Sequence, residues 1–141
     1  MGIRDKKFIY FNSSEIFKND IIWGALELNI NVEIAKYVVD INDYEEKDII
    51  RVLEELENYD VAMTQNFVAA IAEACFRVKK PYISWVYDSP QRGLYLKEAL
   101  YETNYIFVFD KNAIERLKTF DIKHIYYLPL SANMIFQHII N

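Results

Sequence analysis

The nine residues from Tyr82 to Pro90 constrain the fold more than any other part of this sequence. The first six are aromatic or β-branched with one exception, and they include no glycine and no charge. Such a segment is typical of a strand that is buried on both faces of a sheet. Asp88 follows it, and then come Ser89, a favourable helix N-cap, and a proline suited to the first helical turn. The strand therefore delivers a carboxylate to the edge where open α/β sheets bind ligands, beyond the carboxyl ends of their strands.

The rest of the chain repeats the alternation of strand and helix. Six strands alternating with five helices over short connections are typical of a parallel sheet, because each right-handed crossover lays its helix across the sheet. The sequence therefore predicts an α/β fold, a Rossmann-like open parallel sheet of about six strands with helices on both faces. Besides the central strand, short apolar runs predict strands at residues 8–11, 32–39, 60–64, 105–109 and 124–128.

Caps and helical spacing predict the helices between these strands. The first helix has two alternative starts, a cap at Ser13 or Ser14 or a later cap at Asn19-Asp20. The second helix starts at the capping-box-like Asp43-x-x-Glu46 and packs through Ile49, Leu53 and Leu56. A largely buried helix follows at residues 67–78 and stops at Lys79-Lys80-Pro81, and another is predicted at residues 91–101. The last helix is capped by Asp110 or Asn112 and has Ile114, Leu117 and Phe120 on one face.

Composition and charge narrow the class of protein. With 141 residues, of which 52% are hydrophobic, the chain fits one compact domain. The net charge of −5 and the lack of a basic stripe disfavour nucleic-acid binding, and no apolar run is long enough to span a membrane. The single cysteine, Cys75, excludes an intramolecular disulfide and suits a reducing compartment. We therefore expect a soluble cytoplasmic protein without a membrane span or a nucleic-acid partner.

Several common chemistries lack their residues in this sequence. The three glycines are Gly2, Gly24 and Gly93, so no glycine-rich turn follows the first strand to hold a pyrophosphate. We therefore expect no cofactor in this domain. The two histidines, His124 and His138, are not at ligand spacing, so we expect no metal site. His124 also stands at the entrance of the strand predicted at residues 124–128, which places it at the sheet edge opposite the expected site, and a polar edge role is favoured for it.

Polar side chains follow the predicted strands at the points where the strands end. Because the carboxyl ends of parallel strands share one edge, we expect these side chains to gather there. They are hydroxyls, amides and carboxylates with few cations, a set that suits a neutral polyol better than a phosphate. The candidates for binding such a ligand are Asn12, Ser13, Ser14, Gln65, Asn66, Asp88, Asp110 and Asn133.

Helix capping is the alternative role for each of these residues. It accounts well for Ser89 and Asp110 and tolerably for Asn66. For Asp88, which precedes the better cap, capping and function are equal alternatives. A carboxylate at that position can act as a general base toward a sugar hydroxyl, so Asp88 is the candidate catalytic residue.

Three segments, taken in order, resemble a known family. They are Trp85-x-x-Asp88-x-Pro90, then Phe107-Val108-Phe109-Asp110, then His124-x-x-Tyr127-Leu128-Pro129-Leu130-x-Ala132-Asn133. Over about residues 8–133 the chain resembles the N-terminal domain of bacterial glycosyltransferases related to the spore maturation protein CgeB. The resemblance implies the GT-B architecture, in which two Rossmann-like halves face each other across a cleft. In that architecture the N-terminal half mainly receives the acceptor, and the C-terminal half binds the nucleotide-sugar donor.

The resemblance also predicts how the chain is divided. Residues 1–133 would form the N-terminal glycosyltransferase domain, and the apolar residues 134–141 would begin a linker or helix toward a C-terminal domain that this chain lacks. We expect the fragment to be inactive alone. Its partners would be its own C-terminal domain and an acceptor sugar or glycosylated substrate, with the nucleotide-sugar bound mainly by the C-terminal domain. The alternative is a non-catalytic Rossmann-like module that binds a ligand or another protein.

Overall fold

A computed structural model describes residues 5–11, 18–37, 43–86 and 92–128 of the chain. Within these residues six strands form one sheet, and every neighbouring pair is parallel. The predicted α/β fold with a Rossmann-like parallel sheet is therefore confirmed. The strands are β1 (Lys7–Phe11), β2 (Asn31–Ile34), β3 (Val61–Gln65), β4 (Tyr82–Val86), β5 (Asn104–Val108) and β6 (Ile125–Tyr127).

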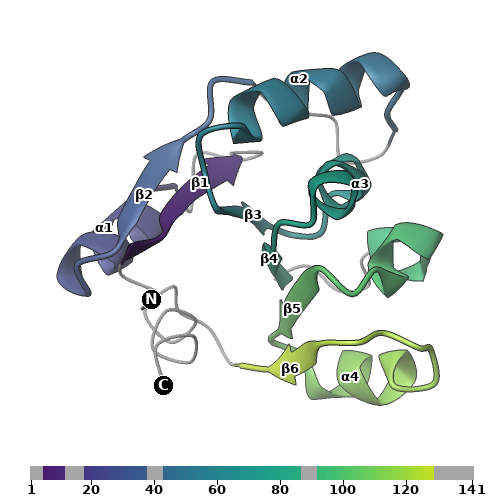
Figure 1. Ribbon diagram of the computed structural model, residues 1–141. Coiled ribbons are helices and arrows are strands. Elements are labelled where there is room, and N and C mark those ends of the chain that lie inside the picture. Colours follow the sequence, from purple (N-terminus) through teal and green to yellow (C-terminus); the bar gives the residue numbers. More distant parts are fainter. Residues whose placement is uncertain (1–4, 12–17, 38–42, 87–91, 129–141) are drawn as a thin grey trace.

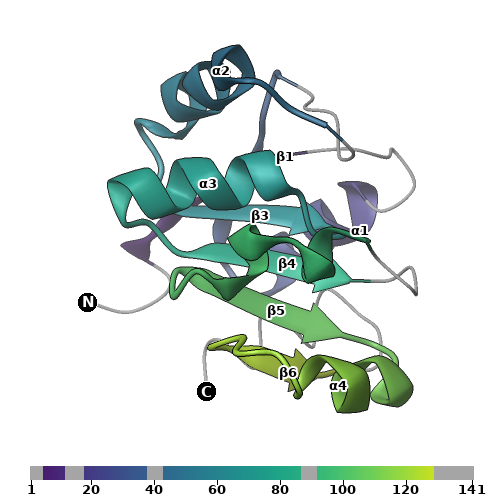
Figure 2. The ribbon, with the colours of Figure 1, turned by 90° about the vertical axis from the view of Figure 1, so that its right-hand side faces the viewer.

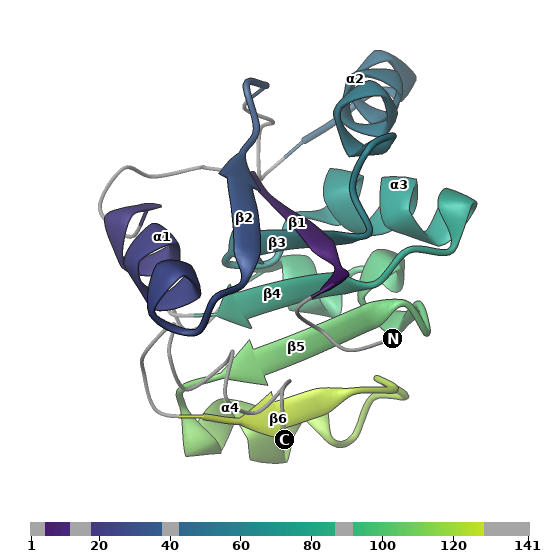
Figure 3. The ribbon, with the colours of Figure 1, turned by 60° about the vertical axis from the view of Figure 1, so that its left-hand side comes forward.

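Helices cover both faces of this sheet, as predicted (Figure 1, Figure 3). One side, which we call the α1 face, carries α1 (Lys18–Glu27). The other side, the α3 face, carries in chain order α2 (Glu46–Leu56), α3 (Ala69–Val78), the 3-10 helices η2 (Arg92–Tyr95) and η3 (Lys97–Leu100), and α4 (Lys111–Leu117).

No helix in the described ranges is long and apolar enough to cross a membrane.

The strand order, β2-β1-β3-β4-β5-β6, reverses direction once, between β1 and β3. From β1 the chain moves outward to β2, then returns past β1 to β3 and continues through the remaining strands in sequence. Figure 2 shows β3, β4 and β5 pointing the same way beneath α3. In doubly wound sheets, ligands bind beyond the carboxyl ends of the strands next to such a reversal. The carboxyl ends of β1 and β3 therefore mark the edge of the sheet where a site is expected.

Strand β4 lies inside the sheet and is buried along its whole length, as its sequence predicts. Tyr82 and Val86 join the core on the α3 face, whereas Ile83 and Trp85 join the core on the α1 face. None of these four side chains is more than 4% exposed. Because burial of one large apolar side chain stabilises a protein by ~1.5–3 kcal/mol, this strand binds both helical layers to the sheet.

Helix α3 is buried on most of its circumference and ends where the sequence predicts. Six of its ten residues are buried, and Lys79 ends it in the left-handed conformation with φ 58°. It begins at Ala69 rather than at Phe67, because Val68 still has an extended backbone. Both preceding residues are nevertheless buried in the core of the α3 face.

Charged side chains on the outer side of α3 link this helix to its neighbours. Arg77 donates to the two carboxylate oxygens of Glu46 in α2, at 2.5 and 2.9 Å, and to Glu73 at 2.8 Å. Tyr101, which follows η3, donates to the other oxygen of Glu73 at 2.6 Å. The Tyr101 hydroxyl and the Arg77 guanidinium hold the pKa of Glu73 below its usual range. The network therefore joins α2 and the end of η3 to α3.

The prediction of a single helix from Gln91 to Tyr101 is wrong. Gln91 lies outside the described residues, and the segment after it forms η2 and η3 instead. Between them Leu96 has an extended backbone, with φ −92° and ψ 160°, which interrupts helical hydrogen bonding. Gly93 lowers the helix propensity of the first turn, and the break lets Leu94 and Ala99 both reach the core. Tertiary packing therefore overrides the helical pattern here.

The second strand is shorter than predicted. β2 ends at Ile34 rather than at residue 39, and residues 38–42 lie outside the described part of the chain. The backbone N–H groups of Lys36 and Tyr37 leave the sheet and donate to one carboxylate oxygen of Glu55 in α2, each at 3.2 Å. A side chain that satisfies two successive N–H groups replaces the sheet partners that a longer strand would need.

Two helix starts differ from the predicted caps. α1 begins at Lys18, so Asn19 and Asp20 lie in its first turn, and the alternative caps at residues 13 and 14 lie outside the described residues. The N-cap of α2 is Glu45, whose N–H donates to Asp48 at 2.8 Å. The capping box therefore begins at Glu45, two residues later than the predicted start at Asp43. Each of these two acidic residues is followed three positions later by another acidic residue, so the two sequence patterns are alike.

The prediction for the last helix is confirmed for its buried face but not for its length. Ile114 and Leu117 are buried, as predicted. Phe120 lies beyond the end of α4 and is 45% exposed, so it does not belong to the buried face.

We predict that Glu55→Ala lowers the free energy of unfolding by about 1–2 kcal/mol, because two backbone N–H groups lose a charged acceptor. Urea denaturation measures this loss. The matched control is Glu54→Ala, which removes an exposed carboxylate from the same helix and should stay within about 0.5 kcal/mol of the wild type. An equal effect of the two substitutions would contradict this account of how β2 ends.

Candidate functional site

The structure describes three of the eight candidate binding residues, Gln65, Asn66 and Asp110. All three follow or end strands of the sheet at its carboxyl edge. These three residues therefore lie at the same edge of the sheet, at the ends of β3 and β5, and their binding roles stay predictions. The other candidates lie outside the described residues, so both their positions and their roles stay predictions: Asn12, Ser13, Ser14, Asp88 and Asn133.

The turn after β3 has a defined and unusual backbone. Gln65 is the last residue of the strand and is 5% exposed. Asn66 follows with φ 64°, in the left-handed region, which asparagine tolerates better than most residues with a Cβ atom. Its N–H donates to the carbonyl oxygen of Trp85 in the neighbouring strand at 2.7 Å. The turn is therefore fastened to β4 three residues before Asp88.

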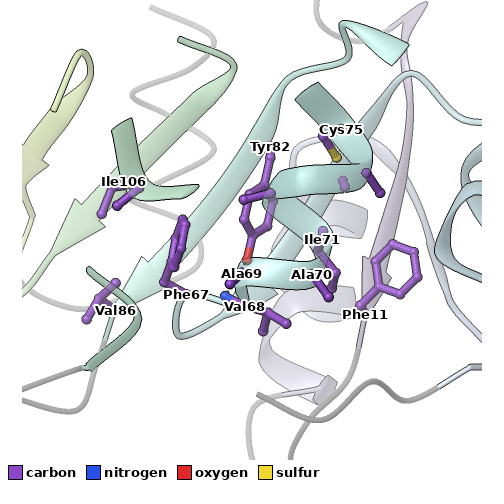
Figure 4. Close-up of a cluster of buried hydrophobic side chains, with 14 of the residues drawn as sticks. Phe11, Phe67, Val68, Ala69, Ala70, Ile71, Cys75, Tyr82, Val86 and Ile106 are labelled. Atoms are coloured by element: carbon purple, nitrogen blue, oxygen red, sulfur yellow. Dashed lines mark hydrogen bonds between the residues drawn. The ribbon is translucent and has the colours of Figure 1, made fainter. Parts of the chain in front are cut away.

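A buried chain of hydrogen bonds holds this turn from the core side. The Val68 N–H donates to the Tyr82 hydroxyl at 3.0 Å, and that hydroxyl lies 2.5 Å from the Thr64 hydroxyl. The Thr64 hydroxyl donates to the carbonyl oxygen of Asn66 at 2.5 Å. Figure 4 shows the Tyr82 ring passing through the apolar cluster to reach the start of α3.

The geometry fixes the direction of every hydrogen bond in the chain. Thr64 has one hydroxyl proton and gives it to Asn66, so it must accept from Tyr82. Tyr82 in turn accepts from the Val68 N–H. Each hydroxyl therefore donates once and accepts once, and every buried donor in this series of hydrogen bonds has an acceptor. Burial raises the pKa of Tyr82 and keeps its hydroxyl protonated.

The turn after β5 is held by a helix cap. Asp110 is the N-cap of α4, and its side chain accepts from the Asn112 N–H at 2.9 Å. The capping role predicted as an alternative for Asp110 is therefore confirmed. The next residue, Lys111, places its ammonium 5.4 Å from the centre of the Tyr127 ring at the end of β6. This edge accordingly carries a carboxylate, a cation and an aromatic ring in addition to the polar turn after β3.

These two turns flank the end of the central strand. In register, Gln65 of β3 is the partner of Trp85 in β4, which is the partner of Phe107 in β5. Since neighbouring strands lie about 4.8 Å apart, the ends of β3 and β5 are separated by about 10 Å. Strand β4 ends between them at Val86, two residues before Asp88 in the sequence. The arrangement offers hydrogen-bonding groups on both sides of the end of β4.

The supporting roles of Thr64 and Tyr82 were not predicted from the sequence. The sequence places Tyr82 in a buried strand and Thr64 at the end of the predicted strand at residues 60–64, without linking them. Their contact depends on the register of β3 against β4, which pairs Thr64 with Ser84, two residues beyond Tyr82 on the same face. A hydroxyl-bearing residue inside each of two apolar strands was the available signal.

The described residues offer no metal or thiol site. No group of three or more His, Cys, Asp or Glu side chains among them is arranged to hold a metal ion. Cys75 is buried in α3, and burial raises the pKa of its thiol, which disfavours the reactive thiolate. His124 immediately precedes β6, at the amino edge of the sheet, and its ring stacks on Tyr105 at 4.4 Å. The predicted location of His124, opposite the candidate edge, is confirmed.

Comparison with known proteins found no matching family model and no match among curated proteins.

We predict that Tyr82→Phe and Thr64→Val each lower the free energy of unfolding by about 1–2 kcal/mol, because each leaves a buried partner unsatisfied. Hydrogen exchange should speed up at the amide of Val68 in the Tyr82→Phe variant. Because both substitutions break the same chain, the double variant should lose less stability than the sum of the two.

Ser84→Ala is the matched control for this prediction. Ser84 lies opposite Thr64 in register and is fully buried, and its hydroxyl makes no hydrogen bond within the described part of the chain. Its loss should change stability by less than about 0.5 kcal/mol. If Ser84→Ala destabilises as much as Thr64→Val, the chain of hydrogen bonds does not hold the turn.

Proposed function

We propose that this chain is the N-terminal, acceptor-side domain of a bacterial glycosyltransferase with the GT-B architecture. The full protein would transfer a sugar from a nucleotide-sugar donor to an acceptor in the cytoplasm. The observation that carries the proposal is the pair of polar turns at Asn66 and Asp110, which flank the strand that leads to Asp88. The three segments of family resemblance and the Rossmann-like sheet support the same assignment.

The polar groups at this edge suit the hydroxyl groups of an acceptor. Amide, carboxylate and backbone groups can each donate to or accept from a sugar hydroxyl without requiring a charge on the ligand. The sequence has no glycine-rich phosphate loop after its first strand, which fits a donor bound mainly by a second, C-terminal domain. That domain and the acceptor are the partners that the proposal requires.

Asp88 would act as a general base in an inverting transfer. Its carboxylate would take the proton from the acceptor hydroxyl as that oxygen attacks the anomeric carbon of the donor. The bond from the anomeric carbon to the nucleoside diphosphate breaks as the new glycosidic bond forms, and the diphosphate leaves with the bonding electrons. The turns at Asn66 and Asp110 would orient the acceptor for this attack.

A second candidate function, a protein-interaction module, is favoured by one surface feature. Exposed apolar side chains gather where η2 and η3 approach the end of α4. Tyr95 and Phe120 meet edge to face at 5.5 Å and are 48% and 45% exposed. Leu96 and Leu100 add 47% and 43% exposed side chains. Such a group can serve a protein partner without any catalytic residue.

We predict that Asp88→Asn in the full-length protein lowers turnover by about 100-fold or more, because the amide cannot accept the acceptor proton. Turnover is measured as release of nucleoside diphosphate in the presence of donor and acceptor. The matched control, Asp121→Asn, removes an exposed carboxylate that pairs only with a surface lysine in the described structure and should leave turnover unchanged. Wild-type turnover in Asp88→Asn would exclude the base assignment.

Two substitutions at Asn66 separate the role of its side chain from that of its backbone. Asn66→Gly removes the amide but permits φ 64° at no steric cost, whereas Asn66→Ala also costs about 1–2 kcal/mol in the left-handed region. If the amide binds the acceptor, both variants should raise the KM for acceptor, and Asn66→Ala should lower thermal stability more than Asn66→Gly does. An unchanged acceptor KM in Asn66→Gly would remove Asn66 from the binding site.

A further inference from the structure

A pocket of about 390 Å³ lies at the amino edge of the sheet, opposite the candidate acceptor edge. Its walls come from the end of α3 and from the residues that lead into β4, β5 and β6. The strands that begin here end at the opposite side, where their arrowheads lie in Figure 2. The pocket is therefore separate from the proposed acceptor site. It is lined by Lys79, Pro81, Glu102, Thr103, Tyr105 and His124.

One wall of the pocket is a pair of stacked rings. The ring centres of Tyr105 and His124 are 4.4 Å apart, and their planes differ by 10°. Tyr105 belongs to β5, and the carbonyl oxygen of His124 accepts from the Ile106 N–H at 3.0 Å, so both rings are carried by paired backbone. Both residues are only half-buried. In a parallel stack each ring covers one face of the other, so the pair offers its outer ring faces and its edges to a planar ligand.

The pocket also carries two opposite charges. Lys79 is exposed, and its ammonium is held 4.1 Å from the centre of the Phe76 ring by a cation–π contact. Glu102 is exposed on the segment that leads into β5. With one lysine and one glutamate, the charged groups of the pocket sum to zero. This balance disfavours a phosphate, which would need several cations, and it matches a ligand with one charge of each sign.

We propose that this pocket binds an aromatic α-amino acid in its zwitterionic form. The aromatic ring lies against the Tyr105–His124 pair, the carboxylate faces the Lys79 ammonium, and the α-ammonium faces the Glu102 carboxylate. The volume is in the range typical of small-molecule sites, which begins at about 300 Å³. The inference does not depend on the glycosyltransferase assignment, since it uses none of the residues at the acceptor edge.

The test is a titration of the protein with L-tryptophan, followed by two-dimensional NMR of backbone amides. We expect saturable shifts at Thr103 and Tyr105. L-alanine supplies both charges without the ring, and indole supplies the ring without the charges, so each should bind at least about fivefold more weakly than L-tryptophan if ring and charges both contribute. Absence of saturable shifts with L-tryptophan would overturn the proposal, and so would equal affinity for L-alanine or for indole.

Charge-removing variants locate the binding in this pocket. Lys79→Met and Glu102→Gln change exposed side chains and should each weaken L-tryptophan binding about two- to fivefold, the range expected of exposed charge pairs. The matched controls are Lys118→Met and Glu115→Gln, exposed residues of the α4 region that do not line the pocket. They should bind L-tryptophan as the wild type does. Unchanged affinity in both pocket variants, or an equal loss in the controls, would overturn the proposal.

Discussion

The candidate edge depends on a hydrogen-bond chain that lies inside the apolar core. Val68, Tyr82, Thr64 and Asn66 are linked in that order, and each link uses a group that would otherwise be buried without a partner. An unsatisfied buried polar group costs about 1–3 kcal/mol, so the core favours this conformation of the turn after β3 by a similar amount. The hydrogen-bond chain therefore connects the packing of α3 against the sheet to the position of Asn66. A ligand at this edge would meet a turn that is already ordered.

The two edges of the sheet offer different chemistry for a structural reason. At the carboxyl edge, strands pass into polar turns and helix starts, which supply amides, carboxylates and backbone N–H groups at Asn66 and Asp110. At the amino edge, strands begin after short connections, and the half-buried rings of Tyr105 and His124 stack there. The same parallel sheet thus presents a hydrogen-bonding edge and a stacking edge, which makes two independent sites physically reasonable.

Local signals in the sequence predicted much of the fold, and non-local packing accounts for the rest. The apolar run of β4, the stop at Lys79 and the cap at Asp110 are each decided by a few neighbouring residues; the first two were predicted correctly, and Asp110 was one of the two predicted caps. The break at Leu96 and the early end of β2 depend on the core and on Glu55, which are distant in sequence. No local pattern could reveal them.

The same division applies to the candidate site. Parallel topology placed Gln65, Asn66 and Asp110 at one edge, because that placement needs only the direction of the strands. The contact between Thr64 and Tyr82 also requires the register between two strands, which the sequence does not state. The role of Asp88 rests on sequence and resemblance.

The most direct measurement of the central claim is a crystal structure of the full-length protein with acceptor and nucleoside diphosphate bound. The account predicts that acceptor hydroxyls lie within hydrogen-bonding distance of Asn66 and of Asp88, at the carboxyl edge of the sheet. It also predicts that the nucleotide contacts a second domain. An acceptor bound elsewhere, or a nucleotide seated on the turn after β1, would contradict it.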